Sequence, residues 1–440
     1  MKPYYLVLGL LVAGCAVGTD YQRPEVAMET RFVGGNAEQI GAVATQQWWL
    51  NYKDSNLTSL LTRGLAQNLD VIAAGERIRQ AQAELRTTGV NAAADGSLTG
   101  SVTNGTSTVE SGTLGASLVI DLFGGIRRER EAAVASLTAA RAEEETVRLA
   151  WLAELIAAYS DARYYQEAMA LTRTAIATRE ETVSITRSQF NAGAATEYEV
   201  AEARALLSTA RADLPQFAAL FDANVYAIAT LLNEPAGPIK AQMQKGAPQL
   251  FSPGGARTGV PADLLRNRPD VRSAEADLAA AVANVGVAEA ALYPALSLSG
   301  TVGRTDATDA WSFGPQLSLP VFNQGLLRAS RDAQLSVARQ AEIAWRASIN
   351  EAVEDVQVAQ SNLTRARQRA QLLRTAASDY GRALTLAQEN YRNGAITLLN
   401  LLETDRNTNA ARISAASATN EAAQAWATLK IATGAGAAVT

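Results

Sequence analysis

The chain carries the same series of landmarks twice, about 200 residues apart, and this repeat constrains the fold more than any other feature. Ser97–Val102 (SLTGSV) recurs as Ser297–Val302 (SLSGTV). Further pairs at nearly the same offset are Asp70-Val71 with Asp270-Val271, Leu122–Gly125 with Val321–Gln324, and Phe190–Gly193 plus Thr196 with Tyr391–Gly394 plus Thr397. Such constant spacing indicates a duplicated structural unit.

Each copy contains its predicted elements in the same order. A helix ends near residue 90 (near 290 in the second copy), two alternating polar–apolar segments follow, and a long run without Gly or Pro comes next. These runs, residues 126–192 and 326–380, predict helices of up to about 65 residues. At about 1.5 Å per residue the longer one spans roughly 100 Å, which no compact globular domain needs. We expect each long helix to stop at a glycine turn, Gly193 or Gly394, and a returning helix to begin at Thr196 or Thr397.

The long helices have a coiled-coil-like apolar seam that is incomplete. Apolar residues recur at 3-4-3 spacing in the first helix and at 4-3 spacing in the second, namely at Leu149, Leu152, Ile156 and Tyr159, and at Ile349, Val353 and Val356. Gln360 and Arg367 interrupt the second seam. The pattern therefore favours a broad layer of helices with one face in water over a dry two-stranded coil.

Four segments alternate between polar and apolar residues, near 96–104, 112–121, 295–304 and 311–320. In the fourth, Trp311 and Phe313 oppose Ser312 and Gln316. Strands of about 9–11 residues with one apolar and one polar face are typical of membrane barrels. No apolar run beyond the first 20 residues approaches the roughly 18 residues of a membrane helix, so a membrane span requires strands.

Four strands cannot close into a pore, and open strand edges are not tolerated in lipid. The chain must then pool strands with copies of itself. Two copies supply eight strands, whose barrel interior is filled by side chains, whereas three supply twelve and can leave a lumen. A soluble pair of hairpins capping a helical coil is the alternative.

The N-terminus has the layout of a bacterial secretory signal. A basic residue, Lys2, precedes an apolar stretch from Tyr4 to Val12, and small residues follow up to Cys15. The string Leu11–Cys15 (LVAGC) resembles a lipobox, which predicts cleavage before Cys15 and lipid attachment to it. Ala16, rather than aspartate, follows Cys15, which by the sorting rule of such lipoproteins favours the outer membrane over the inner one. The alternative is a lone cysteine inside an ordinary signal peptide.

Composition argues against most catalytic and nucleic-acid functions. The chain has no histidine and one cysteine, which removes the commonest metal ligand and acid–base group and excludes an internal disulfide. It has no GxSxG, HExxH or GxxxxGK[ST] motif, and its net charge is −5. We therefore predict no catalytic residue, metal, cofactor other than the Cys15 lipid, or nucleic-acid partner. If the chain were an enzyme, its catalytic groups would have to be a Ser-Lys pair or two carboxylates.

From about Trp48 to Gly434 the sequence resembles the outer-membrane efflux factor family, the TolC-like lipoproteins (here of the NodT type) of resistance–nodulation–division efflux systems. Two stretches carry the resemblance, Asn267–Val271 continuing to Leu292–Leu296, and Tyr391–Gly394 leading into Leu401–Arg406. The resemblance implies a homotrimer with a twelve-stranded barrel and a long α-helical barrel. It also implies a periplasmic adaptor protein and an inner-membrane efflux pump as partners.

The resemblance also implies a gate near the two glycine turns. By position, Glu403 is the acidic and Arg406 the basic residue of the constriction, Asn400 stands where some relatives have a second acid, and Tyr391 and Glu199 link neighbouring helix pairs. The turn residues Gly193, Thr196, Gly394 and Thr397 are the expected adaptor-docking positions. Two simpler explanations stay open: Thr196 and Glu199 also form a capping-box pattern, and Glu403 and Arg406 could be a surface ion pair.

The sequence thus predicts a mainly α fold with a small membrane β-barrel and an internal two-fold repeat. The expected segments are a signal peptide (1–14), a lipidated segment (15–50), a first repeat (51–250, hairpin 96–121), a second repeat (251–434, hairpin 295–320) and a tail (435–440). The expected function is passive exit of drugs or other small molecules through the outer membrane, from a lipid-anchored protein that extends into the periplasm. The alternative is a structural or adhesive periplasmic coiled-coil lipoprotein without transport.

Overall fold

The structure is a computed structural model that describes residues 16–35, 38–89, 93–105, 108–255, 257–306 and 308–438. The predicted signal peptide and Cys15 lie outside these ranges. The described residues form two compact units, one from within 16–28, 73–145 and 269–351, and the other from within 29–72, 146–268 and 352–438. None of the described helices is both long and apolar enough to cross a membrane.

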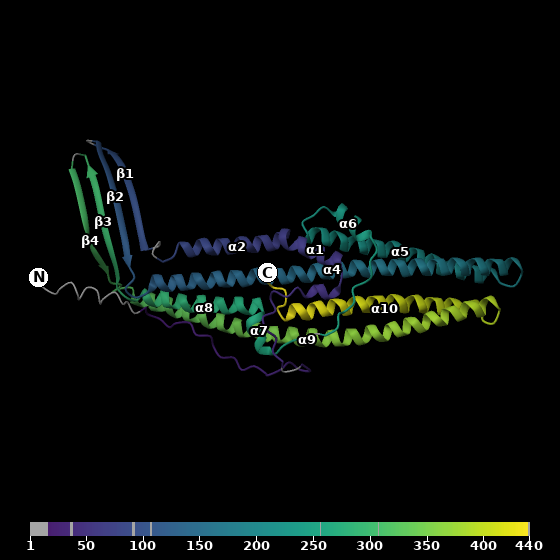
Figure 1. Cartoon of the computed structure of the whole chain (residues 1–440). Coiled ribbons are helices and arrows are strands. Elements are labelled where there is room, and N and C mark those ends of the chain that lie inside the picture. Colours follow the sequence, from purple (N-terminus) through teal and green to yellow (C-terminus); the bar gives the residue numbers. More distant parts are fainter. Residues whose placement is uncertain are drawn as a thin grey trace. The chain divides into compact units, whose positions relative to one another are not determined.

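The elements of the two repeats follow one another in the predicted order (Figure 1). The first repeat contains η1 (Trp48–Tyr52), α1 (Ser55–Gln67), α2 (Leu69–Arg86), β1 (Ala94–Asn104), β2 (Thr108–Ile120), α4 (Gly125–Asn191) and α5 (Glu197–Leu231). After α6 (Ala236–Gln244), the second contains α7 (Pro261–Asn267), α8 (Pro269–Ala290), β3 (Ala295–Thr305), β4 (Thr308–Ser318), α9 (Gln324–Arg392) and α10 (Leu398–Ala432).

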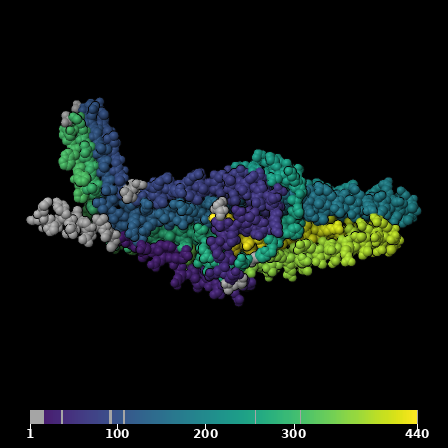
Figure 2. Space-filling model, in the orientation of Figure 1, coloured from purple at the N-terminus to yellow at the C-terminus, as the bar shows by residue number. Residues whose placement is uncertain are grey.

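The four strands form one antiparallel sheet in the order β1-β2-β3-β4, so that the two hairpins pair through β2 and β3. In Figure 2 they make one continuous surface, with the strands of the second repeat beside those of the first. The predicted starts of β2 and β4, residues 112 and 311, were wrong by a few residues. Thr108–Ser111 carries little apolar alternation, and its strand conformation comes from pairing with β1, as in Asn104 opposite Thr108.

The register places apolar side chains on one face of the sheet and small or polar ones on the other. Directly paired residues share a face, and one such row across all four strands is Leu98, Leu114, Val302 and Trp311. These four apolar side chains are exposed. The row beside it, on the other face, is Ser97, Gly115, Thr301 and Ser312, and the hydroxyls of Thr301 and Ser312 lie 2.7 Å apart.

Both long helices are confirmed, with 67 residues in α4 and 69 in α9. Each ends in a glycine with positive φ, +74° at Gly193 and +70° at Gly394. The two turns have the same backbone hydrogen bonds, from Gly193 N to Phe190 O and Ala194 N to Gln189 O, and from Gly394 N to Tyr391 O and Ala395 N to Asn390 O. Both are Schellman-type ends, whose left-handed backbone at this position is adopted by glycine without strain.

The structure also tests the predicted apolar seam of the first long helix and the predicted end of the helix before the first hairpin. The predicted seam residues of the first helix, Leu149 to Tyr159 at 3-4-3 spacing, are buried. Helix α2, which precedes the first hairpin, ends at Arg86 and not near residue 90, because Thr87 and Thr88 already form turn hydrogen bonds to Glu84 and Leu85.

Candidate functional site

The two helical turns of one chain pack together through a small apolar cluster. Its buried members come mainly from α9 and α10, with Ala203 from α5, and they are Ala203, Leu384, Ala387, Tyr391, Leu398, Leu401 and Leu402. Val183 and Ile185 of α4 and Leu206 of α5 pack against them. The helix pair of the first repeat therefore lies directly beside that of the second, as Figure 1 also shows.

Tyr391 joins the two repeats at the centre of this cluster. Only 6% of the residue is exposed, and its hydroxyl donates to Gln189 Oε1 (2.7 Å) and lies 3.1 Å from Thr186 Oγ1. Burial raises the pKa of the Tyr391 phenol above its ordinary value, so the hydroxyl stays protonated and able to donate at neutral pH. The expected linking position thus connects α9 to α4 inside one chain.

A buried ion pair that sequence reasoning missed lies close to the turns. Arg179 Nε of α4 donates to Asp405 Oδ2 of α10 at 2.6 Å, with side chains only 5% and 6% exposed. Arg179 Nη1 also donates to the Leu206 carbonyl of α5 at 3.1 Å. One guanidinium therefore holds three helices from both repeats.

Glu199 acts as a helix cap in this structure. Its carboxylate accepts hydrogen bonds from the Thr196 backbone N–H (2.7 Å) and hydroxyl (2.9 Å), while the Thr196 hydroxyl accepts from Glu199 N. This is a complete capping box, the simpler of the two explanations that the sequence left open.

Asn400 has the matching place in the second repeat. Its amide oxygen accepts from the Thr397 hydroxyl at 2.7 Å, and its backbone N–H donates back to that hydroxyl at 3.4 Å. The residue that departs from the acidic pattern therefore still serves the N-terminus of α10 as a neutral partner.

Glu403 and Arg406 lie on the exposed side of α10, opposite Asp405. Within the described ranges they form no ion pair with each other or with another residue of the chain. The gate and the surface pair both stay predictions for these two residues. Both charges are free to meet groups outside the chain.

The described residues also contain no group of three or more His, Cys, Asp or Glu side chains that could hold a metal ion. The chemistry of this site consists of helix packing, capping and two exposed charges. The described chain combines this site with an antiparallel sheet that exposes an apolar face and with two long helical hairpins.

The particular family follows from the sequence profile of the outer membrane efflux proteins, which matches residues 60–234 and again 260–435. The chain belongs to this family, and the double match corresponds to its internal repeat. Its function is that of an outer-membrane efflux channel. Membership favours transport over the structural or adhesive coil.

Curated relatives and solved structures are similar to this protein over nearly its whole length. Nodulation protein T of Rhizobium leguminosarum bv. trifolii is 36% identical, over 97% of this chain and 96% of that protein. The pyoverdine export outer membrane protein OpmQ of Pseudomonas putida is 32% identical, over 91% and 90%. Among structures, the OprN outer-membrane channel has a TM-score of 0.86 at 28% identity, over 96% of this chain and 100% of that one. The open-state MtrE channel of Neisseria gonorrhoeae has a TM-score of 0.83 at 27% identity, over 96% and 98%.

Proposed function

We propose that three copies of the chain form a passive exit duct that works with a periplasmic adaptor and an inner-membrane pump. The observation that carries this proposal is that the sheet has two open edges and an exposed apolar face. It leaves β1 and β4 at its edges, and its exposed apolar row of Leu98, Leu114, Val302 and Trp311 requires an apolar environment. Three copies that join β4 to the next β1 remove all edges and give a twelve-stranded barrel with its polar face towards the lumen.

The cargo is a small molecule chosen by the pump. Relatives at similar identity are described as exporting different compounds: OpmQ is a pyoverdine export protein, and TtgI of Pseudomonas putida is part of a toluene efflux pump. Such differences among similar ducts favour a generic channel, so drugs and other small molecules are all within its range. A passive duct performs no chemical step, and we expect no enzymatic activity.

The resting gate lies at the helical turns. Glu403 and Arg406 are exposed and unpaired within the described chain, so in a trimer they are available to the equivalent residues of neighbouring subunits. Three copies of one carboxylate form a ring that disfavours anions and repels itself unless cations clamp it. Arg406 is the clamp. Tyr391 and the Arg179–Asp405 pair position the helices that carry the ring.

The adaptor docks on the outer surface of the same turns, at Gly193, Thr196, Gly394 and Thr397. Exposed apolar side chains flank both turns, Phe190 and Tyr198 in the first repeat and Leu399 in the second. Apolar groups at an exposed turn favour a protein partner at this place.

Cys15 carries the lipid that ties the protein to the outer membrane, in addition to the sheet. The support is the lipobox-like string Leu11–Cys15 and its place directly after an apolar signal segment. Metabolic labelling with palmitate tests this point. A labelled wild type and an unlabelled Cys15→Ser variant support it, and an unlabelled wild type overturns it.

Single-channel recording in planar bilayers tests the duct and the gate together. Wild-type protein should give pores, and the double variant Glu403→Ala/Arg406→Ala should give a larger resting conductance and sensitise cells to bulky antibiotics. The matched control is Glu342→Ala/Arg346→Ala, which removes an exposed pair of α9 with the same charges. Absence of pores in every variant overturns the duct. Pores whose conductance and drug sensitivity do not change overturn the gate alone.

A further inference from the structure

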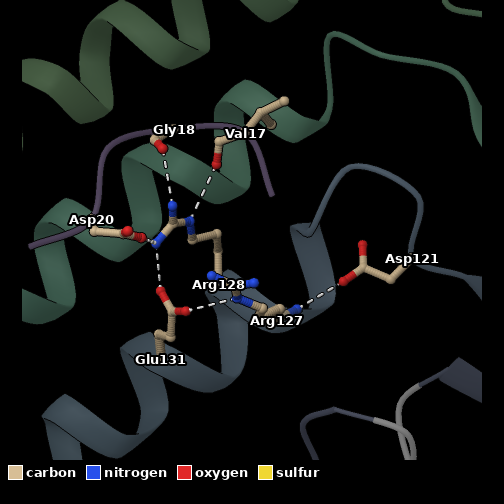
Figure 3. A network of polar contacts seen from close by, with 7 residues as sticks. All are labelled: Val17, Gly18, Asp20, Asp121, Arg127, Arg128 and Glu131. Carbon is tan, nitrogen blue, oxygen red and sulfur yellow. Dashed lines mark hydrogen bonds and ion pairs between the residues drawn. The ribbon is translucent and has the colours of Figure 1, made fainter. Parts of the chain in front are cut away.

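Arg128, near the start of α4, is almost fully buried and binds the first described residues of the chain through hydrogen bonds and an ion pair (Figure 3). Its Nε donates to the Val17 carbonyl at 3.2 Å and its Nη2 to the Gly18 carbonyl at 2.9 Å. Its Nη1 forms ion pairs with Asp20 (2.8 Å) and Glu131 (2.7 Å). Only 3% of the arginine side chain is exposed, so its charge is satisfied by these partners and not by solvent.

Three glycines make room for the segment. Gly18 has φ +84°, and a Cβ there would lie 2.8 Å from Gly286 Cα of α8. A Cβ on Gly286 would lie 2.8 Å from Arg128 Cγ, and one on Gly124 would lie 2.5 Å from Ala16 Cβ. Since real Cβ atoms do not approach this closely, larger side chains at these positions would displace the segment. The site is therefore shaped for residues 16–20.

Further bonds hold the same segment on both sides of Arg128. Val17 N donates to the Phe123 carbonyl, between β2 and α4, at 2.9 Å. Arg23 donates from Nε and Nη2 to the two carboxylate oxygens of Glu275 on α8, both at 2.6 Å. We call residues 16–23 the N-terminal strap. It contacts α4 of the first repeat and α8 of the second.

We propose that the strap fixes the point at which the acylated N-terminus leaves the protein, and that Arg128 is its positioning residue. This inference rests on the proposed acylation of Cys15. Ala16 lies against Gly124, and Cys15 directly precedes Ala16 in the sequence. Because consecutive α-carbons are about 3.8 Å apart, a docked strap limits how far from Gly124 the acyl group can be attached. The docked strap thereby restricts the attachment point of the lipid to the neighbourhood of the junction between β2 and α4.

A purely local structural role for Arg128 predicts something different. Such a residue would affect the stability of the α4 N-terminus without changing where the lipid lies. The two roles separate in an experiment that reports strap docking and lipid position independently of stability.

The first measurement is hydrogen exchange of the full-length lipidated protein, read on peptides that cover the strap. Arg128→Gln should speed exchange there at least tenfold while the sheet and the rest of α4 keep wild-type rates. The matched control is Arg127→Gln, next to it on the helix, whose side chain is 57% exposed and pairs with Glu131. It should stay within twofold of wild type. Equal strap protection in Arg128→Gln and wild type overturns the proposal.

A second variant keeps the test decisive if Arg128→Gln does not fold. Asp20→Asn removes only the carboxylate that the strap itself supplies, and that residue is largely exposed. It should also speed strap exchange, by a smaller factor. A folded Asp20→Asn protein with a wild-type exchange pattern counts against the strap.

The second measurement locates the lipid. Cells are fed a fatty acid that carries a diazirine near its carboxyl end, and cross-linked peptides are identified after illumination. Wild type and Arg127→Gln should cross-link to peptides around residues 119–126, and Arg128→Gln should lose this preference. The same cross-links in all three proteins overturn the positioning role. An unlabelled wild type overturns the acylation proposal instead, and in that case strap exchange still reports whether the segment docks.

Discussion

Asp405→Ala should loosen the packing of the two helical turns by several kcal/mol. The substitution leaves the Arg179 guanidinium buried, and among the described residues the Leu206 carbonyl is its remaining hydrogen-bond partner. Removing one member of a buried ion pair typically costs about 3–5 kcal/mol, because the remaining charge has lost both water and its counterion. Both side chains are at most 6% exposed, so solvent does little to reduce this cost.

Two controls separate burial of charge from loss of a contact. Glu180→Ala removes an exposed ion pair between α4 and α5, since Glu180 and Arg211 lie 2.7 Å apart with half-exposed side chains. Its cost should stay below about 1 kcal/mol. The double variant Arg179→Met/Asp405→Leu removes both charges, and replacing a buried pair with apolar residues is often neutral or stabilising. It should recover most of the stability that Asp405→Ala loses.

Native-state hydrogen exchange is the suitable assay, because membrane oligomers often unfold irreversibly and give no equilibrium melting curve. A loss of about 3–5 kcal/mol in local opening corresponds to an acceleration between about one hundred and a few thousand times. It should appear in peptides around Arg179, Leu206 and Asp405. An acceleration in Asp405→Ala no larger than in Glu180→Ala would refute the reasoning, as would a double variant as loose as the single one.

Three further perturbations test other parts of the structure. Phe313→Lys places a charge on the exposed apolar face of the sheet, so it should destabilise the inserted protein by up to about 2–4 kcal/mol and reduce insertion into the outer membrane. The control Ser312→Lys places the same charge on the other face and should insert normally. Heat-modifiable gel mobility of membrane fractions measures the insertion of both variants. Glu199→Ala removes the charged half of a capping box and should cost about 1 kcal/mol, seen as faster exchange in the first turn of α5, and Glu199→Gln should recover part of it. The third concerns pH: burial alone would raise the pKa of Glu131, but hydrogen bonds from Arg128 and Arg127 outweigh it and lower that pKa below its ordinary value of 4.5. The stabilisation from the Glu131 carboxylate is therefore present above pH 4.5 and is lost as the pH falls through the lowered pKa of that group. Strap exchange, corrected for the intrinsic rate, should then accelerate in acid, and Glu131→Gln should weaken this dependence.

The repeat, the long helices and the glycine turns were predictable because each has a local cause. A run without Gly or Pro has no residue that interrupts the helix, and Gly193 and Gly394 have the positive φ that ends one. The pairing of β2 with β3 was not predictable in the same way. It joins residues far apart in sequence, such as Ala116 and Gly300, and no local pattern encodes that register.

The site was predicted less completely than the fold, for a related reason. A lone carboxylate such as Asp405 is usually solvated, and its partner Arg179 lies 226 positions away in the sequence. One signal was present: Asp405 falls on the same helix face as Leu398, Leu401 and Leu402, which are buried. The strap was even less predictable from the sequence, because Gly18, Arg128 and Gly286 share no motif and come together only in the folded chain.

The two helix caps have a consequence for the symmetry of the proposed assembly. Glu199 and Asn400 make matching contacts with Thr196 and Thr397, yet one is an anion and the other is neutral. Three chains would present six hairpin tips with nearly identical backbones and alternating charge. A partner that recognises the backbone shape of the tips would bind a ring with sixfold symmetry, whereas a partner that recognises their charge would bind a ring with threefold symmetry. A ring of six identical partner subunits would then occupy two chemically distinct kinds of position.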